Sequence, residues 1–205
     1  AEALLADTGA LIIAGAPGVG KTTLAQVLLW RHAEQGWRIF VVDDVEEALK
    51  VANEGQKRLI FFDDFLGQVQ LSADLVRGLD ARLPPLLARV AANKDLRFIL
   101  TTRDYILAQA KALSGRIERP VGVRNYVLNV GRYTREVKAR ILYNHIFFSG
   151  LTPEQREAII FDDFFLKIID HGNFNPRLIE VLTRADYLSM TERPTRDAIM
   201  YALDN

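Results

Sequence analysis

One short segment, residues 15–22, constrains this chain more than any other, because it reads GAPGVGKT and fits the pattern G-x-x-x-x-G-K-[ST]. The apolar run at residues 11–14 before it has the character of a short strand, and residues 23–30 after it have the character of a helix. The sequence therefore predicts a strand, a tight loop and a helix in direct succession. A glycine-rich turn that ends in Lys-Thr by chance is a poor alternative, since both flanking elements fit.

The predicted loop is suited to hold phosphate groups. Glycines at positions 15, 18 and 20 allow backbone torsions and close approaches that a Cβ would forbid, so consecutive N–H groups can wrap a phosphate. The following helix adds the positive end of its dipole. Lys21 would reach the β- and γ-phosphates of a nucleoside triphosphate, and the Thr22 hydroxyl would ligate Mg²⁺ beside them. The expected nucleotide contacts are Gly15, Ala16, Pro17, Gly18, Val19, Gly20, Lys21, Thr22 and Thr23.

Composition narrows the class of protein. With 49% hydrophobic residues among 205, the chain has ample material for a packed core. Its 26 basic and 26 acidic residues leave no net charge, so nothing indicates general binding to nucleic acid or to a membrane surface. The lack of cysteine agrees with a cytoplasmic protein, and no apolar run approaches the roughly 20 residues of a membrane span. Because the chain opens on Ala1 inside a helical pattern, we expect a fragment of a longer multidomain protein.

Five short apolar segments predict strands, and helical patterns separate them. The segments are residues 11–15, 38–42, 58–62, 97–101 and 126–130. This alternation is typical of an α/β fold in which helices cover both faces of a parallel sheet. Beyond Gly131 only helical patterns follow. We therefore expect a nucleotide-binding α/β core at residues 1–131 and a helical lid subdomain at residues 132–205.

Proline disturbs one long helical pattern in the core. Ser72 would cap this helix at its N-terminus. Pro84 and Pro85 lack the backbone N–H that a helix needs, so we expect them to break or restart it.

Capping signals divide the lid into helices. Thr134 would cap a helix that reaches about residue 148, and Thr152 opens a capping box with proline at the first helical position. Two more helices are expected at residues 177–188 and 194–202. An aspartate pair at residues 162–163 starts a helical pattern, where the helix dipole explains it.

An acidic residue at the tip of a neighbouring strand is needed to position Mg²⁺, usually through its waters. We assign this role to Asp63-Asp64, which follow the third strand: Asp63 for the metal, and Asp64 to orient or deprotonate an attacking water. Asp43-Asp44 also follow a strand, but they lead directly into a helix, where they serve as a capping and first-turn acidic pair. Solvated strand ends are the alternative for both pairs.

Two arginines are candidate phosphate sensors. If the fourth strand lies between the first and the third, its end at TTRD points between the γ-phosphate and the water, and Arg103 could stabilise the phosphate charge. Pairing of Arg103 with Asp104 or another surface carboxylate is an equally good explanation. In the lid, Pro176 fits the first helical position, and Arg177 on the first turn could bridge to the nucleotide. A purely structural turn is the simpler interpretation there.

Together, GAPGVGKTT, LIFFDDFLG, FILTTRD and the late NFNPR resemble the STAND class of P-loop NTPases, the signal-transduction ATPases with many appended domains. The likeness is closest to novel STAND NTPase family three and covers nearly the whole chain. The loop motif is highly specific for nucleotide binding, the two strand-end motifs are moderately specific for the class, and the lid turn is weakly so.

This resemblance implies an ASCE-type P-loop NTPase fold, a three-layer α/β/α arrangement with a parallel five-stranded sheet ordered 5-1-4-3-2, plus a C-terminal helical lid. It implies ATP as the substrate and Mg²⁺ as the cofactor, with the metal held through Thr22 and Asp63. Fused effector and sensor domains and a nucleotide-dependent homo-oligomer are the implied partners. The implied catalytic residues are Lys21, Asp63, Asp64 and Arg103, and the implied lid contacts are Pro176 near the base and Arg177 as a second sensor.

The chain departs from the pattern in one respect. STAND proteins of the apoptotic type continue into a winged-helix domain with a nucleotide-sensing histidine, and none is evident before Asn205. Autoinhibition through such a histidine is therefore in doubt for these residues. Members of the family often occur in bacterial antiviral proteins.

Three functions compete. The first is a regulated ATPase switch, and the second an AAA+-like motor or loader on nucleic acid, which a basic strip supports weakly. The third and weakest is a small-molecule kinase, because no arginine-rich closing lid is present. No guanine-specifying N-K-x-D stretch occurs, so the choice of adenine rests on the family likeness. The basic strip comprises Arg132, Arg135, Lys138 and Arg140.

Overall fold

The structure is a computed structural model that describes residues 1–53, 55–65, 73–105, 126–131 and 133–205. The chain divides into two compact units. The first comprises Ala1–Pro17 and Lys21–Val130, and the second comprises Gly131–Asn205 with Gly18–Gly20.

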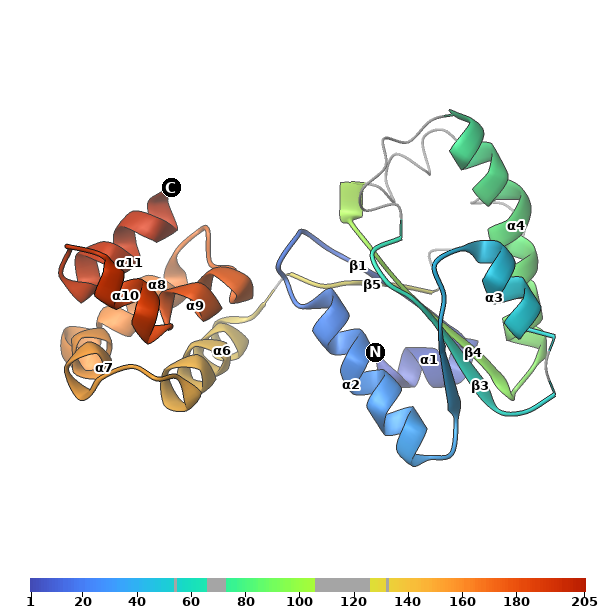
Figure 1. Ribbon diagram of the computed structural model, residues 1–205, viewed down its shortest axis with the longest axis horizontal. Coiled ribbons are helices and arrows are strands. Elements are labelled where there is room, and N and C mark those ends of the chain that lie inside the picture. Colours follow the sequence, from blue (N-terminus) through green and yellow to red (C-terminus); the bar gives the residue numbers. More distant parts are fainter. Residues whose placement is uncertain (54, 66–72, 106–125, 132) are drawn as a thin grey trace. The chain divides into compact units, whose positions relative to one another are not determined.

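A five-stranded parallel sheet forms the centre of the first unit (Figure 1). The strands lie in the order β2-β3-β4-β1-β5, which is the implied order 5-1-4-3-2 seen from the other edge. All five expected strands are present, so the α/β prediction is confirmed. Their bounds are β1 Ala10–Ala14, β2 Arg38–Val41, β3 Arg58–Phe62, β4 Leu96–Thr102 and β5 Val127–Asn129.

Helices cover both faces of this sheet (Figure 1). Along β1, Leu11 and Ile13 pack with α1 and α2, whereas Ile12 packs with α3 and α4 on the opposite face. Because successive strand residues point to opposite faces, a strand buried on both faces must be apolar throughout, as β1 is. The helices of this unit are α1 Glu2–Thr8, α2 Lys21–Glu34, α3 Val45–Val51 and α4 Ala73–Ala92.

The expected break at the proline pair is wrong, because α4 runs through Pro84 and Pro85. Two prolines inside a helix remove two backbone donors and crowd the preceding turn, which is unfavourable. Packing offsets this effect, since apolar residues around the prolines stay buried on the same side of the helix. Ser72, the expected cap, lies outside the described residues. The buried residues are Leu83, Leu86, Leu87 and Val90.

A buried histidine ties α2 to β4. His32 is 1% exposed, and its Nδ1 lies 2.7 Å from the carbonyl oxygen of Leu28. A carbonyl only accepts, so Nδ1 carries the proton, and Nε2 accepts from the Arg97 guanidinium. Arg97 also lies over the Trp37 ring, 4.5 Å from its centroid. Burial, aided by the charge of Arg97, lowers the pKa of His32.

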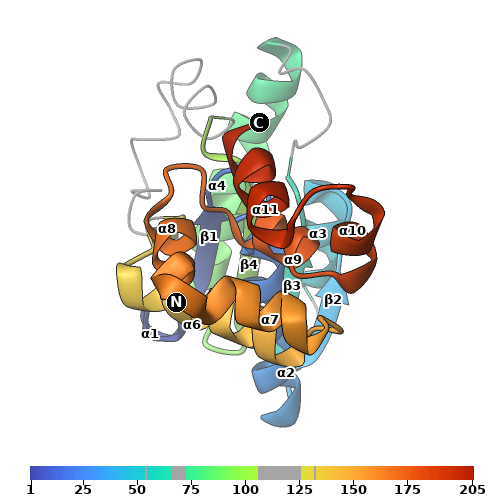
Figure 2. The same cartoon turned by 90° about the vertical axis from the view of Figure 1, so that its left-hand side faces the viewer.

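The second unit is a cluster of short helices around its own apolar core (Figure 2). Buried residues such as Leu142, Ile159, Ile168 and Ile199 come from four different helices and meet in this core. Its elements are α6 Arg135–Phe148, α7 Pro153–Ile160, the 3-10 turn η2 Phe161–Asp163, α8 Phe164–Asp170, α9 Pro176–Leu182, α10 Ala185–Met190 and α11 Thr195–Asp204.

The capping predictions for this unit hold. Thr134 caps α6, and Thr152 caps α7 in a complete capping box with Gln155. The single helix expected at residues 177–188 is instead two, α9 and α10. The break falls after Thr183, whose buried hydroxyl donates to the Ile179 carbonyl oxygen at 2.8 Å.

The aspartate pair Asp162-Asp163 does not simply open a helix either. Both residues have left-handed backbone angles, with φ of 53° and 55°. Asp163 stands at the N-cap of α8 without a side-chain cap hydrogen bond, so the pair forms a turn between η2 and α8. Across the described part of the chain, no helix is both long and apolar enough to span a membrane.

The geometry around His32 predicts how stability depends on pH. The unfolded chain takes up a proton on this residue near its ordinary pKa of about 6.5, whereas the folded protein resists that proton until a lower pH. The contribution of His32 to the free energy of unfolding is therefore complete above about pH 6.5. It is lost as the pH falls below this value, because the unfolded chain then gains the proton more readily than the folded protein does. Denaturant unfolding from pH 7.5 to 5.0 measures this loss. His32→Gln, neutral at every pH, should show a shallower decline, and equal slopes would contradict the assignment.

Candidate functional site

The polar residues of the site lie at the carboxyl ends of three adjacent strands. β4 pairs with β1 on one side and with β3 on the other, both in parallel. In this register Ala14 is opposite Thr102, and Phe62 is opposite Leu100. The loop after β1, the aspartates after β3 and the end of β4 therefore meet at one edge of the sheet.

The glycine-rich loop follows β1 and ends in α2. Gly18 and Gly20 have φ of 79° and 83°, a region that favours glycine, as the motif predicts. Lys21 is 9% exposed, and its Nζ donates to the carbonyl oxygens of Gly15 at 3.0 Å and Ala16 at 2.9 Å. Burial lowers the pKa of Lys21, while the carboxylates of Asp64, Asp104 and Asp63 act in the opposite direction. The Lys21 ammonium group is thus bound to the backbone of the loop that precedes it.

A hydrogen bond joins the loop helix to the third strand. The Thr22 hydroxyl on α2 donates to Asp63, with 3.0 Å between Oγ1 and Oδ1 and 3.3 Å to Oδ2. These residues are 41 positions apart in the sequence. Because the hydroxyl proton points to the carboxylate, the lone pairs of Thr22 Oγ1 stay available to a cation.

Asp64 and Arg103 lie beside this pair. Asp64 has φ of 44°, a left-handed conformation that is uncommon outside glycine but tolerated by aspartate and asparagine. Its Oδ2 lies 3.7 Å from Nη2 of Arg103, whose Nη1 donates to the Tyr105 hydroxyl at 3.1 Å. Asp104 instead accepts from the backbone N–H of Tyr105. The surface carboxylate that pairs with Arg103 is therefore Asp64.

Thr101 belongs to this cluster, although the sequence predicts no role for it. Thr101 on β4 is fully buried, and its Oγ1 contacts both Asp63 and the backbone of Asp64. The threonine pair at the end of a buried strand was the signal, but threonine is also an ordinary strand residue. The structure thus adds a fourth side chain to Thr22, Asp63 and Asp64.

The competing aspartate pair has a structural role. Asp44 is the N-cap of α3, and its side chain accepts from the backbone N–H of Glu47 at 2.7 Å. The Asp43 backbone N–H donates to the Glu47 side chain in return, at 3.2 Å. The cap at Asp44 is as the sequence predicts, whereas Asp43 precedes the cap and the acidic residues of the first turn are Glu46 and Glu47.

The lid residues lie in the second unit. Pro176 occupies the first position of α9, and the Arg177 backbone N–H donates to the side chain of the N-cap Asn175 at 2.9 Å. Proline fits this position because its missing N–H would be unpaired there anyway. The nucleotide contact expected of Arg177 stays a prediction.

The donor set fits a magnesium nucleotide. In the described parts of the chain, no group of three or more His, Cys, Asp or Glu side chains could hold a metal ion by itself. Mg²⁺ commonly takes one or two protein oxygens together with substrate phosphates and waters, which Thr22 and Asp63 can satisfy. Lys21, which is buried at the end of the loop, would supply the cation for the phosphate charge.

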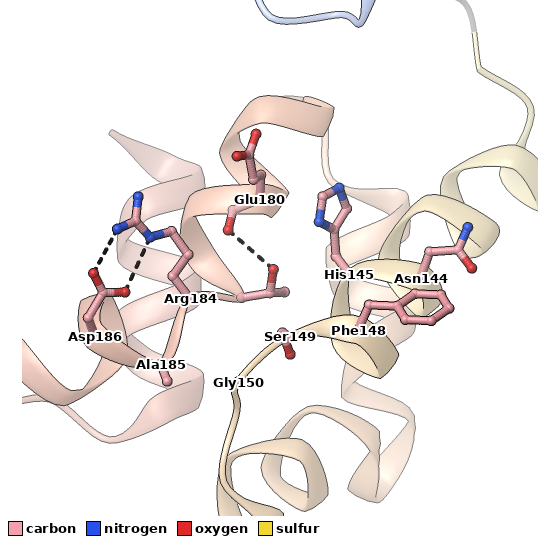
Figure 3. Close-up of a pocket in the computed structure, with 10 residues that line it drawn as sticks. Asn144, His145, Phe148, Ser149, Gly150, Glu180, Arg184, Ala185 and Asp186 are labelled. Atoms are coloured by element: carbon pink, nitrogen blue, oxygen red, sulfur yellow. Dashed lines mark hydrogen bonds and ion pairs between the residues drawn. The ribbon is translucent and has the colours of Figure 1, made fainter. Parts of the chain in front are cut away.

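A hollow of about 420 Å³ lies in the second unit between the last turn of α6 and the α9–α10 junction (Figure 3). Arg184 and Asp186 point toward each other on one wall and form an ion pair of 2.8 Å. None of the residues predicted to bind nucleotide lines this hollow.

The basic strip at the start of the second unit is partly engaged. Arg135 donates through two nitrogens to the carboxylate of Asp170, each at 2.8 Å. Lys138 lies over the Phe174 ring, 5.1 Å from its centroid. Arg132 lies outside the described residues. Two of the strip's cations thus have internal partners, which weakens the nucleic-acid hypothesis.

Comparison with known families decides the class of the protein. The model of the family described as Novel STAND NTPase 3 matches residues 1–148. The chain belongs to this family. It is accordingly a P-loop NTPase domain, and the resemblance that the motifs carry is confirmed. No curated protein matches the chain.

Solved structures share the fold at low sequence identity. Domain III of the replication initiation protein DnaA from Thermotoga maritima is 16% identical with a TM-score of 0.57, covering 99% of this chain and 89% of that one. The FIGL-1 AAA domain in complex with ADP is 15% identical with a TM-score of 0.54, covering 98% and 78%. A mutant of RuvB from Thermotoga maritima is 16% identical with a TM-score of 0.48. The match covers 95% of this chain but only 61% of the RuvB chain.

The backbone at position 64 leads to a prediction about stability. Asp64→Val places a β-branched residue at φ of 44° and should lower the free energy of unfolding by about 1–2 kcal/mol. Asp64→Asn, which tolerates this region, should change it by less than about 0.5 kcal/mol. Denaturant unfolding without nucleotide gives both values. Equal losses for the two variants would show that the left-handed conformation does not matter.

Proposed function

We propose that this domain is an ATP-dependent switch. It binds ATP with Mg²⁺, hydrolyses it slowly, and its nucleotide state controls oligomerisation and the activity of effector domains fused to it. A role in bacterial antiviral defence is part of this proposal and rests on the family alone. The ATP-binding and hydrolytic part rests on the geometry of the site.

The hydrogen bond between Thr22 and Asp63 is the single observation that carries the proposal. It joins the end of the phosphate loop to the acidic strand end, at 3.0 Å and 41 positions apart in the chain. The two groups expected to hold one metal ion are therefore neighbours, and Lys21 is buried directly before Thr22. The other aspartate pair is used in capping a helix.

Each side chain has a distinct part in the proposed hydrolysis. The loop amides and Lys21 bind and orient the phosphates, and Thr22 and Asp63 would hold Mg²⁺, which supplies charge neutralisation on the β- and γ-phosphates. Asp64 orients a water and accepts its proton as the water oxygen bonds to the γ-phosphorus. The bond between the γ-phosphorus and the oxygen that bridges it to the β-phosphate breaks, and ADP leaves with that oxygen. Arg103 stabilises charge on the γ-phosphoryl oxygens.

Removing the buried ammonium tests binding. Lys21→Ala should weaken ATP affinity at least about a hundredfold, because it removes charge-assisted hydrogen bonds worth roughly 1.5–3 kcal/mol each. Titration with a fluorescent ATP analogue measures this. Lys50→Ala, a substitution of an exposed lysine in the last turn of α3, is the control and should bind as the wild type does. Unchanged affinity in Lys21→Ala would overturn the proposal.

Removing one carboxylate separates hydrolysis from binding. Asp64→Asn should slow ATP turnover by about 10²–10⁴-fold, because the amide cannot accept the proton of the attacking water. Its ATP affinity should stay within a few-fold of the wild type. Asp43→Asn makes the same chemical change at the other aspartate pair and should leave turnover intact. Turnover by Asp64→Asn at the wild-type rate would remove Asp64 from this role.

The switch differs from its competitors in measurable ways. A switch retains one bound nucleotide per chain through purification, turns over slowly, and changes its sedimentation coefficient between ADP and a non-hydrolysable ATP analogue. Severalfold stimulation of turnover by DNA would favour a loader instead. Production of ADP only in the presence of a small acceptor would favour a kinase.

A further inference from the structure

A buried hydroxyl on β4 contacts both aspartates of the site. Thr101 is fully buried, and its Oγ1 lies 2.6 Å from Oδ1 of Asp63. The same oxygen lies 2.7 Å from the backbone nitrogen of Asp64. Thr101 thus bridges a side chain and a main chain on the neighbouring strand end.

The direction of these two hydrogen bonds is fixed by elementary chemistry. A backbone N–H only donates, so Thr101 Oγ1 accepts from Asp64. A hydroxyl has one proton, and that proton therefore goes to Asp63 Oδ1. Oδ1 also accepts from Thr22 at 3.0 Å, whereas among the described residues Oδ2 has only the longer 3.3 Å contact with that hydroxyl. The carboxylate is held by Oδ1 and presents Oδ2 with most of its accepting capacity unused.

We propose that Thr101 is a positioning residue for the metal. Its hydroxyl orients the Asp63 carboxylate toward Mg²⁺ and holds the Asp64 backbone in its left-handed conformation. This inference rests on the proposed function, because it assigns Asp63 to a magnesium nucleotide. Groups that orient metal ligands from the second layer commonly change metal affinity 10–100-fold when removed.

The rest of the turn is held independently of this hydroxyl. The Phe65 backbone N–H donates to the Thr101 carbonyl oxygen at 2.8 Å, and the Thr102 hydroxyl donates to the Phe65 carbonyl oxygen at 3.1 Å. Valine has the shape of threonine and suits a buried strand. Thr101→Val should therefore keep the strand and the turn, and remove only the contacts to Asp63 and Asp64.

The experiment measures Mg²⁺-dependent nucleotide binding rather than turnover. A fluorescent non-hydrolysable ATP analogue is bound to the whole chain in EDTA, and Mg²⁺ is then titrated in. Thr101→Val should bind the analogue in EDTA within about twofold of the wild type and need about 10- to 100-fold more Mg²⁺ for the half-maximal change. Thr101→Ser, which keeps the hydroxyl, should restore the wild-type titration. Thr102→Val is the matched control and should titrate as the wild type does.

The possible outcomes distinguish failure of the Thr101 inference from failure of the proposed function on which it rests. If the wild type binds and Thr101→Val follows the same Mg²⁺ titration, the role of Thr101 is wrong and the proposed function stands. If Thr102→Val, which removes the hydrogen bond to the Phe65 carbonyl oxygen, shows the same weakening, general loosening of the strand and turn explains the effect and the inference is also wrong. If the wild type binds no nucleotide under either condition, both fail. Melting temperatures check that each variant folds, and Thr101→Ala replaces Thr101→Val if valine prevents folding.

Discussion

The parallel pairing of β4 between β1 and β3 is the constraint on which the site depends. It brings together three chain segments that are far apart in sequence, because the carboxyl ends of parallel neighbours meet at one edge. A one-residue slip of β4 would turn Thr101 from this cluster to the opposite face. The apolar residues on both faces of the strands fix the register, so the hydrophobic cores on either side of the sheet also determine the geometry of the polar groups.

Each polar group at that edge has a partner within the protein. Lys21 donates to loop carbonyls, Thr22 and Thr101 donate to Asp63, and Arg103 lies beside Asp64. An unpaired buried charge would be strongly destabilising, so the contacts with the loop carbonyl oxygens allow the Lys21 ammonium to be buried at this edge of the sheet. In the proposed function, binding of a nucleotide would exchange these partners. Lys21 would leave the carbonyl oxygens of its loop for phosphate oxygens, and the affinity for the nucleotide would reflect the difference in free energy between the two sets of contacts.

Much of this could be predicted from the sequence, because the informative patterns are local. Strand composition gave all five strands, and cap residues such as Thr134 and Thr152 marked helix starts. What the sequence did not predict depends on tertiary contacts. The prolines at 84–85 stay helical because buried neighbours compensate, and the role of Thr101 depends on which strand lies beside β4. A strand threonine has the same appearance in sequence whether its hydroxyl meets a carboxylate or only fills space.

The position of β2 has a consequence for a domain that is proposed to assemble. β2 is the outermost strand on its side of the sheet, and Val41 at its end is 64% exposed. An open strand edge is a template for pairing with any other extended chain, which favours non-specific aggregation. Two features oppose this: the strand is only four residues long, and it begins with the charged Arg38. A short edge with a charged residue opposes such non-specific pairing and leaves specific association to other surfaces of the domain.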